Sequence, residues 1–262
     1  MRFTPRAVLT EDTSVFEGQT LNRNVEVDMG SPSEIIQKAR GEGRTVLTEI
    51  ESKQLLKGLG IPTTEMRLAA SEDQAVDISK EIGYPCVLKV SSHDITHKSD
   101  AGGVKVGLKD GTEVAVAYQA IMTSCKAKYP DAVIEGVTVQ NMAKAGVEVI
   151  VGMATDPQFG PVLMFGLGGV WVELLKDVSF KIVPLSRRDA ATAIGDIKAA
   201  RLLEGFRGSD PVDKGALEDI LLRVSEFVAN TPEVAEMDLN PIFAYADGAI
   251  AVDARVILQS VI

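Results

Sequence analysis

Two short apolar segments, Cys86–Val90 and Val104–Leu108, enclose a polar loop that contains both histidines of this 262-residue chain. Each segment has the length and composition of a buried β-strand. Similar short strands recur along the sequence, and turn signals rather than helices separate several of them. This pattern predicts an α+β fold in which neighbouring strands are often joined by hairpins, not a strict βαβ alternation.

Helical periodicity and capping residues place the remaining elements. Ser31, Pro32 and Glu34 have the spacing of a capped helix start, and Ser186 with Asp189 repeats it. The predicted helices cover residues 31–41, 48–59, 71–83, 113–128, 186–203 and 217–228. The predicted strands lie near residues 63–69, 85–90, 103–108, 133–140, 147–153, 162–165, 178–184, 236–245 and 249–258. Residues 1–30 lack sustained periodicity and are predicted to form an extended N-terminal arm.

Composition excludes several classes of function. The formal net charge of −10 argues against non-specific binding to nucleic acids, which needs a basic surface. No run of about 18 apolar residues is present, so no transmembrane helix is expected, and the N-terminus lacks the apolar core of a secretory signal. The two cysteines, Cys86 and Cys125, have no metal-binding spacing and are expected to be reduced, although the sequence leaves a bridge between them open. We therefore predict a cytoplasmic protein.

The loop between the first two segments has the residue types of a phosphate-handling unit. Lys89 lies in the strand before it, His93 and His97 lie within it, and Gly102 with Gly103 opens the next strand. Lysine and backbone N–H groups bind phosphate oxygens, and an imidazole can accept a phosphoryl group covalently. An ordinary surface loop with solvated histidines is an equally good interpretation of the loop pattern alone.

The C-terminal segment has the pattern of a β-hairpin with one polar face. Alternation along the first strand places Glu236, Asp238 and Asn240 on the same side. Asp247-Gly248 is a strong signal for a two-residue turn, and Asp253 follows on the return strand. The hairpin therefore predicts a cluster of oxygen-bearing side chains.

A turn at residues 247–248 would make the numbers of paired residues sum to 495. Asn240 would then oppose Arg255, and Asp253 would oppose Ile242. Asn240 and Asp253 would be diagonal neighbours, roughly 7–8 Å apart at the backbone. That separation suits two oxygen ligands of a Mg²⁺ ion that also binds nucleotide phosphates. The alternative is a polar stripe that faces solvent.

Together these segments resemble the ATP-grasp subunit of the NDP-forming acyl-CoA synthetases. The likeness covers about residues 32–262. It is greatest for the beta subunit of archaeal ADP-forming acetyl-CoA synthetases and more distant for the beta subunit of succinyl-CoA synthetase. The motifs that carry it are Val-Leu-Lys-Val at 87–90, His-Lys-Ser-Asp-Ala-Gly-Gly-Val at 97–104, Asp-Pro-Gln-Phe-Gly-Pro at 156–161, Phe-Gly-Leu-Gly-Gly-Val at 165–170, Asp-Leu-Asn-Pro at 238–241 and Val-Asp-Ala-Arg at 252–255.

The resemblance implies an ATP-grasp fold, in which two lobes clamp ATP or ADP between them. A smaller lobe would span about residues 50–142, and a larger lobe about residues 143–262. Lys89 would contact nucleotide phosphates, and Gly102 and Gly103 would belong to a glycine-rich loop over the phosphates. His97 would be the phosphorylated histidine, whereas His93 lies outside the family motif.

The same resemblance implies the rest of the nucleotide site. A hinge between the lobes would meet the adenine, mostly through backbone groups, and it would comprise Gln140, Asn141, Met142 and Ala143. Glu148 would bind the ribose hydroxyls, and Asn240 and Asp253 would hold Mg²⁺. Simpler alternatives exist for single residues, since Glu148 could be an exposed strand residue and Lys89 could extend from a core strand toward solvent.

The implied reaction is acyl-CoA + ADP + phosphate giving acid + ATP + CoA, reversibly, through a phosphohistidine relay. The sequence shows no residues set aside for CoA or for acyl-phosphate formation. A separate alpha subunit with CoA-binding and acyl-phosphate-forming domains is therefore implied, in an α₂β₂ assembly. The alternatives are an ATP-grasp carboxylate–amine ligase and a non-catalytic regulatory ATP-grasp module.

Overall fold

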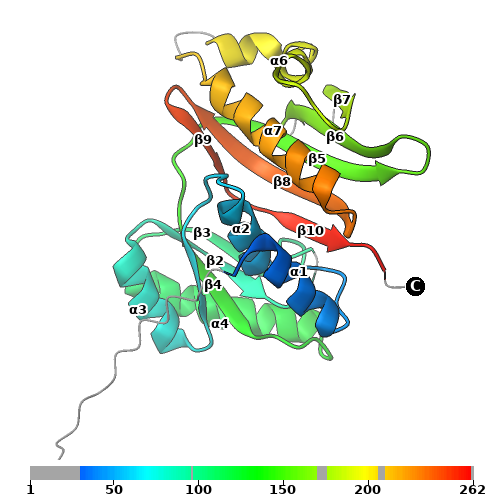
Figure 1. Ribbon diagram of the computed structural model, residues 1–262. Helices are drawn as coiled ribbons and strands as arrows, with labels where there is room; N and C mark the ends of the chain where they lie inside the picture. Colours follow the sequence, from blue (N-terminus) through cyan, green and yellow to red (C-terminus); the bar gives the residue numbers. More distant parts are fainter. Residues whose placement is uncertain (1–29, 96, 170–175, 206–209, 261–262) are drawn as a thin grey trace, which may run out of the picture.

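The structure is a computed structural model that describes residues 30–95, 97–169, 176–205 and 210–260. Two antiparallel β-sheets, each covered by helices, form two lobes, and the C-terminal strand and two N-terminal helices lie between them (Figure 1). The predicted N-terminal arm falls outside the described residues, apart from Gly30. Of the described helices, none is long and apolar enough to cross a membrane.

The smaller sheet has the strand order β1-β4-β2-β3. Its strands are β1 (Met66–Ala69), β2 (Cys86–Ser91), β3 (Val104–Leu108) and β4 (Gly136–Asn141), and its helices are α3 (Glu72–Ile82) and α4 (Gly111–Lys128). Strands β2 and β3 pair antiparallel, so the predicted hairpin is confirmed. Cys86 and Cys125 are both free and buried in the core of this lobe.

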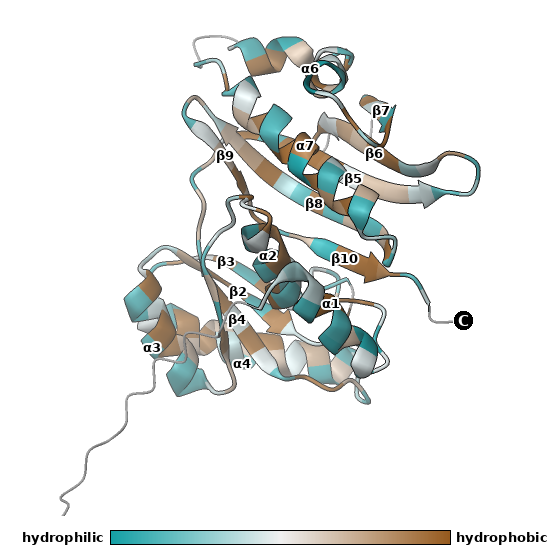
Figure 2. Ribbon diagram, viewed as in Figure 1, coloured by the Kyte–Doolittle hydropathy of each residue, from teal (hydrophilic) through white to brown (hydrophobic). Residues whose placement is uncertain are grey.

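The larger sheet has the order β10-β8-β5-β6-β7, and β9 also pairs with β8. Its strands are β5 (Val147–Asp156), β6 (Gly160–Leu167), β7 (Val178–Ile182), β8 (Val234–Tyr245), β9 (Gly248–Ala251) and β10 (Arg255–Leu258), and its helices are α6 (Arg187–Gly195) and α7 (Lys214–Asn230). Along α7 hydrophobic and hydrophilic residues alternate (Figure 2), and Leu217, Leu221 and Val224 are buried against the sheet. Because Leu239 of β8 lies in this core, its neighbours Asp238 and Asn240 point to the opposite face.

The predicted helix over residues 186–203 is divided in the structure. Helix α6 ends at Gly195, and a 3-10 helix, η1 (Ala200–Glu204), follows it. Between them the carboxylate of Asp177 accepts hydrogen bonds from the N–H groups of Lys198 (2.7 Å) and Ala199 (2.8 Å). The side chain offers these backbone donors a partner outside a continuous helix, which is why the helix breaks here.

Helices α1 (Pro32–Gly41) and α2 (Glu49–Gly58) each begin with a capping box. Leu55 and Leu56 of α2 are buried in the core of the larger lobe, although the smaller lobe was expected to begin near residue 50. The connection between the helices runs beside β10, where the N–H of Leu47 donates to the carbonyl of Val256 (3.1 Å). The first turn of α2 is thereby held next to the C-terminal hairpin.

The turn of the C-terminal hairpin is shifted by one residue from the predicted position. Tyr245 pairs with Gly248, so the two turn residues are Ala246 and Asp247. Gly248 is instead the first residue of the return strand, with a φ of 144° that glycine adopts at little cost. The predicted register, with paired numbers that sum to 495, is therefore wrong.

The observed register changes the partners of the polar residues. Arg255 pairs with Asp238, not with Asn240 as predicted. Strand β8 pairs first with β9 and then with β10, and the register of pairing is the same on both sides of the break between β9 and β10. In that register Asp253 lies opposite Asn240 rather than diagonal to it, so the two predicted metal ligands are closer neighbours than expected.

Candidate active site

A cavity of about 580 Å³ opens between the two lobes. Its wall comes from the start of α2, from β2 and the loop that follows it, and from the polar face of the C-terminal hairpin. Four of the predicted site residues line it together, and they are Lys89, His97, Asn240 and Asp253. They come from segments far apart in the sequence, so only the fold brings them together.

Lys89 lines the cavity, and its ammonium group forms ion pairs with two carboxylates. The side chain is buried, and Nζ donates to Oε1 of Glu49 (2.7 Å) and to Oδ2 of Asp253 (2.8 Å). Burial alone would lower the pKa of Lys89, but the charges of Glu49 and Asp253 outweigh it and hold the pKa above its ordinary value. Lys89 is therefore a permanent positive charge, as a phosphate ligand requires.

Glu49 is the central residue of this charge cluster, and the sequence did not single it out. Its buried carboxylate lies near three ammonium groups, those of Lys53 (3.4 Å), Lys89 (2.7 Å) and Lys98 (2.6 Å). Burial raises the pKa of Glu49, but the three lysines together lower it to about 2. Acidic residues are common in the first turn of a helix, so nothing in the sequence distinguished this one.

Lys53 connects the charge cluster with the predicted adenine hinge. Its buried Nζ donates to Oγ1 of Thr64 and to Oε1 of Gln140, each at 2.8 Å. Burial lowers the pKa of Lys53 to about 8, although the charge of Glu49 opposes the shift. Because Lys53 holds its amide oxygen, Gln140 has a fixed orientation, and within the described part of the chain its NH₂ group donates no hydrogen bond.

The other predicted nucleotide residues, like Gln140, do not line the cavity. Asn141 and Ala143 are half-buried, and Met142 is 45% exposed just after β4. Glu148 is exposed on β5, where its carbonyl accepts a hydrogen bond from the N–H of Gly168 (2.7 Å). These residues lie along the connection from the smaller sheet to the larger one.

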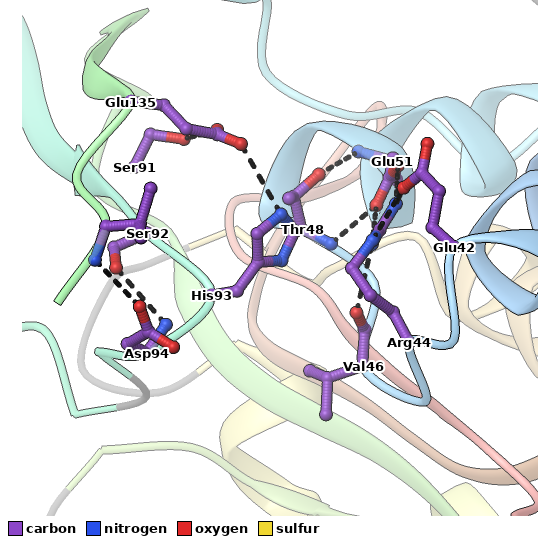
Figure 3. Close-up of polar contacts among 11 residues, drawn as sticks. Glu42, Arg44, Val46, Thr48, Glu51, Ser91, Ser92, His93, Asp94 and Glu135 are labelled. Carbon is purple, nitrogen blue, oxygen red and sulfur yellow. Dashed lines mark hydrogen bonds and ion pairs between the residues drawn. The ribbon is translucent and has the colours of Figure 1, made fainter.

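Both histidines line the cavity. The side chain of His97 is exposed and makes no hydrogen bond to another described residue. By contrast, Nε2 of His93 lies 3.4 Å from Oε1 of Glu135, and Oε2 of Glu135 accepts a hydrogen bond from the hydroxyl of Ser91 (Figure 3). His93 is thus tied to the smaller lobe, whereas the imidazole of His97 is not engaged by any described side chain.

Gly102 and Gly103 close the loop that carries His97. The N–H of Gly102 donates to the carbonyl of Ser99 (3.0 Å), and the N–H of Gly103 donates to the carbonyl of Lys98 (2.7 Å). Gly102 has a φ of 73°, and a Cβ on Gly103 would lie 2.5 Å from a methyl carbon of Val90. The turn and the close approach to β2 therefore require glycine. Both N–H groups are already used within the loop, and neither glycine lines the cavity.

The polar face of the C-terminal hairpin fits a hard cation. Asn240, Asp253 and Asp238 all line the cavity. Burial and the charge of Asp253 raise the pKa of Asp238, while Arg255 lowers it. Carboxylate and amide oxygens are the ligands that Mg²⁺ prefers. The described residues hold no cluster of three or more His, Cys, Asp or Glu side chains able to bind a metal.

An arginine-centred cluster fixes the start of α2 beside the cavity (Figure 3). Arg44 donates to both carboxylate oxygens of Glu51 (2.8 and 3.0 Å) and also to Glu42. Glu51 in turn accepts a hydrogen bond from the N–H of Thr48, the helix cap (2.8 Å). The cluster holds the first turn of α2, and therefore Glu49, in place.

Comparison with known proteins identifies the family. The model of the ATP-grasp domain family matches residues 38–258. The chain is 52% identical over 225 residues to the beta subunit of ADP-forming acetate–CoA ligase I from Pyrococcus furiosus, which covers 86% of this chain and 97% of the relative. It is 46% identical over 235 residues to ADP-forming acetate–CoA ligase I from Archaeoglobus fulgidus, which covers 90% of this chain and 34% of the relative.

Solved structures agree with this assignment and confirm the predicted fold. Acetyl-coenzyme A synthetase 1 of Ca. Korarchaeum cryptofilum, in complex with coenzyme A and Ca-AMPCP, has a TM-score of 0.85 and 51% identity, over 87% of this chain and 100% of that chain. The same enzyme with Mg-AMPPCP, its phosphohistidine segment pointing towards the nucleotide site, has a TM-score of 0.77 and 47% identity over the same shares. The chain belongs to the ATP-grasp family and is similar, over most of its length, to the beta subunits of ADP-forming acetate–CoA ligases.

Proposed function

We propose that this chain is the nucleotide-binding subunit of an ADP-forming acyl-CoA synthetase and that it exchanges a phosphoryl group between His97 and ADP. The observation that carries the proposal is the cavity, in which His97, Lys89, Asn240 and Asp253 converge. The overall reaction would be acyl-CoA + ADP + phosphate giving acid + ATP + CoA, reversibly. Its relatives are ADP-forming CoA ligases, which supports the same reaction here.

In the proposed complex the nucleotide phosphates lie against Lys89. The charge of Lys89 is in place before the nucleotide arrives, so the site needs little rearrangement to receive an anion. The base would lie by the hinge at Gln140, Asn141, Met142 and Ala143. There the exposed Met142 offers apolar surface, and backbone groups of the hinge would offer hydrogen bonds to the base. Glu148 would accept hydrogen bonds from the ribose hydroxyls.

The hairpin residues Asn240 and Asp253, with Asp238 beside them, would hold Mg²⁺, which when bound neutralises charge on the phosphates. For Asp253 this requires that Lys89 turn its ammonium group toward the phosphates while it keeps its bond to Glu49.

The phosphoryl step uses the imidazole of His97 as the carrier. A terminal oxygen of ADP attacks the phosphorus of phospho-His97, a P–O bond forms, and the N–P bond breaks. The electron pair of that bond returns to the imidazole, which takes up one proton and becomes neutral. In the reverse direction the neutral imidazole attacks the terminal phosphorus of ATP and gives up the proton that it took up in the forward step. ADP leaves with the electron pair of the broken P–O bond.

We further propose that an alpha subunit with CoA-binding and acyl-phosphate-forming domains supplies the phosphoryl group in an α₂β₂ assembly. The relative from Pyrococcus furiosus is named as a subunit, and the chain matches 34% of the relative from Archaeoglobus fulgidus, which leaves room there for further domains. Both cysteines are free and buried, which suits a protein of the reducing cytoplasm. The alpha subunit would recognise the acyl group.

Mass spectrometry of the chain after incubation with Mg-ATP tests the proposal. An acid-labile phosphate should appear on His97, should be absent from His97→Ala, and should persist in His93→Ala. Addition of Mg-ADP to the labelled protein should release ATP, which shows that the intermediate is competent. A label lost in His93→Ala but kept in His97→Ala would assign the carrier to the other histidine.

A further inference from the structure

We propose that Lys98 and Glu49 form a latch that holds the histidine loop, residues 92–95 and 97–103, in its nucleotide-facing position. In this role Lys98 is a positioning residue for His97 and not a ligand of the nucleotide. The proposal rests on the proposed function, because it assumes that His97 carries phosphate to and from this cavity. The contact that carries it is the hydrogen bond from Nζ of Lys98 to Oε2 of Glu49, at 2.6 Å.

The two oxygens of Glu49 have different partners. Oε1 accepts from Lys89 of β2 (2.7 Å) and lies 3.4 Å from Lys53 of the same helix, whereas Oε2 accepts from Lys98 of the histidine loop. One carboxylate therefore joins the proposed phosphate lysine to the residue that follows the proposed phosphoryl carrier. A shift of the loop changes the surroundings of only one of these oxygens.

The loop is anchored at its ends and sparsely held in its middle. Near its start Ile95 is buried in the core of the smaller lobe, and near its end the carbonyl of Ala101 accepts from Ser124 (2.9 Å). Between them, of the described residues His97, Lys98 and Ser99, only Lys98 makes a side-chain hydrogen bond to another described residue. The turn around His97 is closed by its own backbone, where the N–H of Ala101 donates to the carbonyl of His97 (3.1 Å). The bond from Lys98 is the described side-chain contact that ties this turn to α2.

The latch can open without leaving a buried charge unpaired. The side chain of Lys98 is 22% exposed, so its ammonium group can move into solvent. Glu49 is 4% exposed, but it keeps Lys89 and Lys53 as partners when Lys98 departs. The large penalty for a buried ion arises when it is left without a partner, and Glu49 keeps two ammonium groups nearby. The arrangement suits a contact that must form and break in each catalytic cycle.

The test compares Lys98→Met with the conservative Lys98→Arg and with Lys105→Met, a matched change of an exposed lysine on β3 that does not line the cavity. Three quantities are measured: the single-turnover rate of His97 labelling by Mg-ATP, the dissociation constant of Mg-ATP, and hydrogen exchange of the loop amides in the full chain. The exchange measurement needs no catalysis, so it examines the latch even if His97 carries no phosphate.

Lys98→Met should slow labelling about tenfold, because the carrier is no longer held in its attack position. The Mg-ATP dissociation constant should change less than about twofold, since one point contact to a phosphate would be worth more than that. Exchange at residues 97–101 should accelerate. Lys98→Arg should restore labelling and protection, and Lys105→Met should behave like the wild type.

Three results would overturn the latch. The first is weakened Mg-ATP binding that accounts for the slower labelling, which would make Lys98 a nucleotide ligand. The second is unchanged loop exchange in Lys98→Met, and the third is equal slowing of labelling from Mg-ATP and from acyl-CoA with phosphate in the complex with the second subunit. A wild-type chain that takes no phosphate on His97 but shows faster loop exchange in Lys98→Met would instead reject the proposed function and retain the latch contact.

Discussion

Two hairpins wall the cavity, and they are built differently. Strands β8 and β9 are joined by two turn residues, and the same register continues into β10. Strands β2 and β3 are joined by the long histidine loop, in which Lys98 makes the side-chain bond nearest to His97. Backbone pairing holds the first hairpin in its sheet, whereas the turn around His97 is closed by its own backbone and is tied to α2 by one described side-chain contact. The backbone pairing of a sheet therefore places the proposed metal ligands, whereas a side-chain contact that can break ties the proposed phosphoryl carrier to α2.

The substitution with the largest expected effect lies in the rigid hairpin. Asp253→Ala should reduce Mg²⁺-dependent nucleotide turnover by about a thousandfold, because it removes a charged metal ligand from the cavity wall. The free energy of unfolding should change little, since the residue lies at a strand break and buries little apolar surface. The control is Asp247→Ala, an exposed turn residue of the same hairpin. Unchanged turnover in Asp253→Ala would mean that the C-terminal hairpin does not hold the metal ligands, and the proposed difference between the two hairpins would fail.

A glycine substitution tests how the histidine loop is closed. Gly103→Ala should lower the free energy of unfolding by about 2 kcal/mol, because the new Cβ would overlap Val90 and crowd the carbonyl of Lys98. Urea titration would measure the loss. Gly41→Ala is the matched control, since a Cβ there meets nothing within 4 Å at the end of a helix. A neutral result for Gly103→Ala would show that the loop adapts more freely than its contacts indicate.

The smallest expected effect concerns the cluster that fixes α2 beside the rigid hairpin. Burial raises the pKa of Glu51, but hydrogen bonds from Arg44 and Thr48 outweigh it and lower the pKa below 4.5. Ionised Glu51 therefore contributes stability that is complete above pH 4.5 and is lost as the pH falls through the lower, folded-state pKa.

Glu51→Gln should cost about 1 kcal/mol near neutral pH, because the pair is partly exposed at Arg44. The difference from the wild type should shrink as the pH falls below 4.5. Thermal unfolding over a pH series would measure it. A difference that stays constant across the series would mean that the ion pair is not the source of the stability.

Local signals predicted most of the fold because capping and periodicity depend on neighbours in the sequence. Ser31 and Ser186 cap helices as expected, and the strands of both sheets lie close to the predicted ranges. The hairpin register was wrong because a turn-forming dipeptide does not say which of its residues forms the turn. Gly248 does adopt a positive φ, but it does so in the return strand, one position after the two turn residues.

The candidate site was predictable only in part. Lys89 and Asp253 stand in recognisable strand motifs, and the cavity does bring them together. Glu49, Lys53 and Lys98 were not predicted. A Glu and a Lys four residues apart are ordinary on an exposed helix, and their significance here comes from burial between two lobes. Burial of that kind depends on tertiary packing, which no local pattern encodes.

The pairing of residues 45–47 with β10 has a mechanical consequence. Val46 bridges to Ile257, and the N–H of Leu47 donates to the carbonyl of Val256, so the start of α2 moves with the larger lobe. Lys89 and Lys98, by contrast, belong to the smaller lobe and reach Glu49 across the boundary between two bodies. A displacement that separates the lobes stretches both bonds at once. If the lobes part to exchange nucleotide, as the proposed function requires, the same opening would also release the histidine loop.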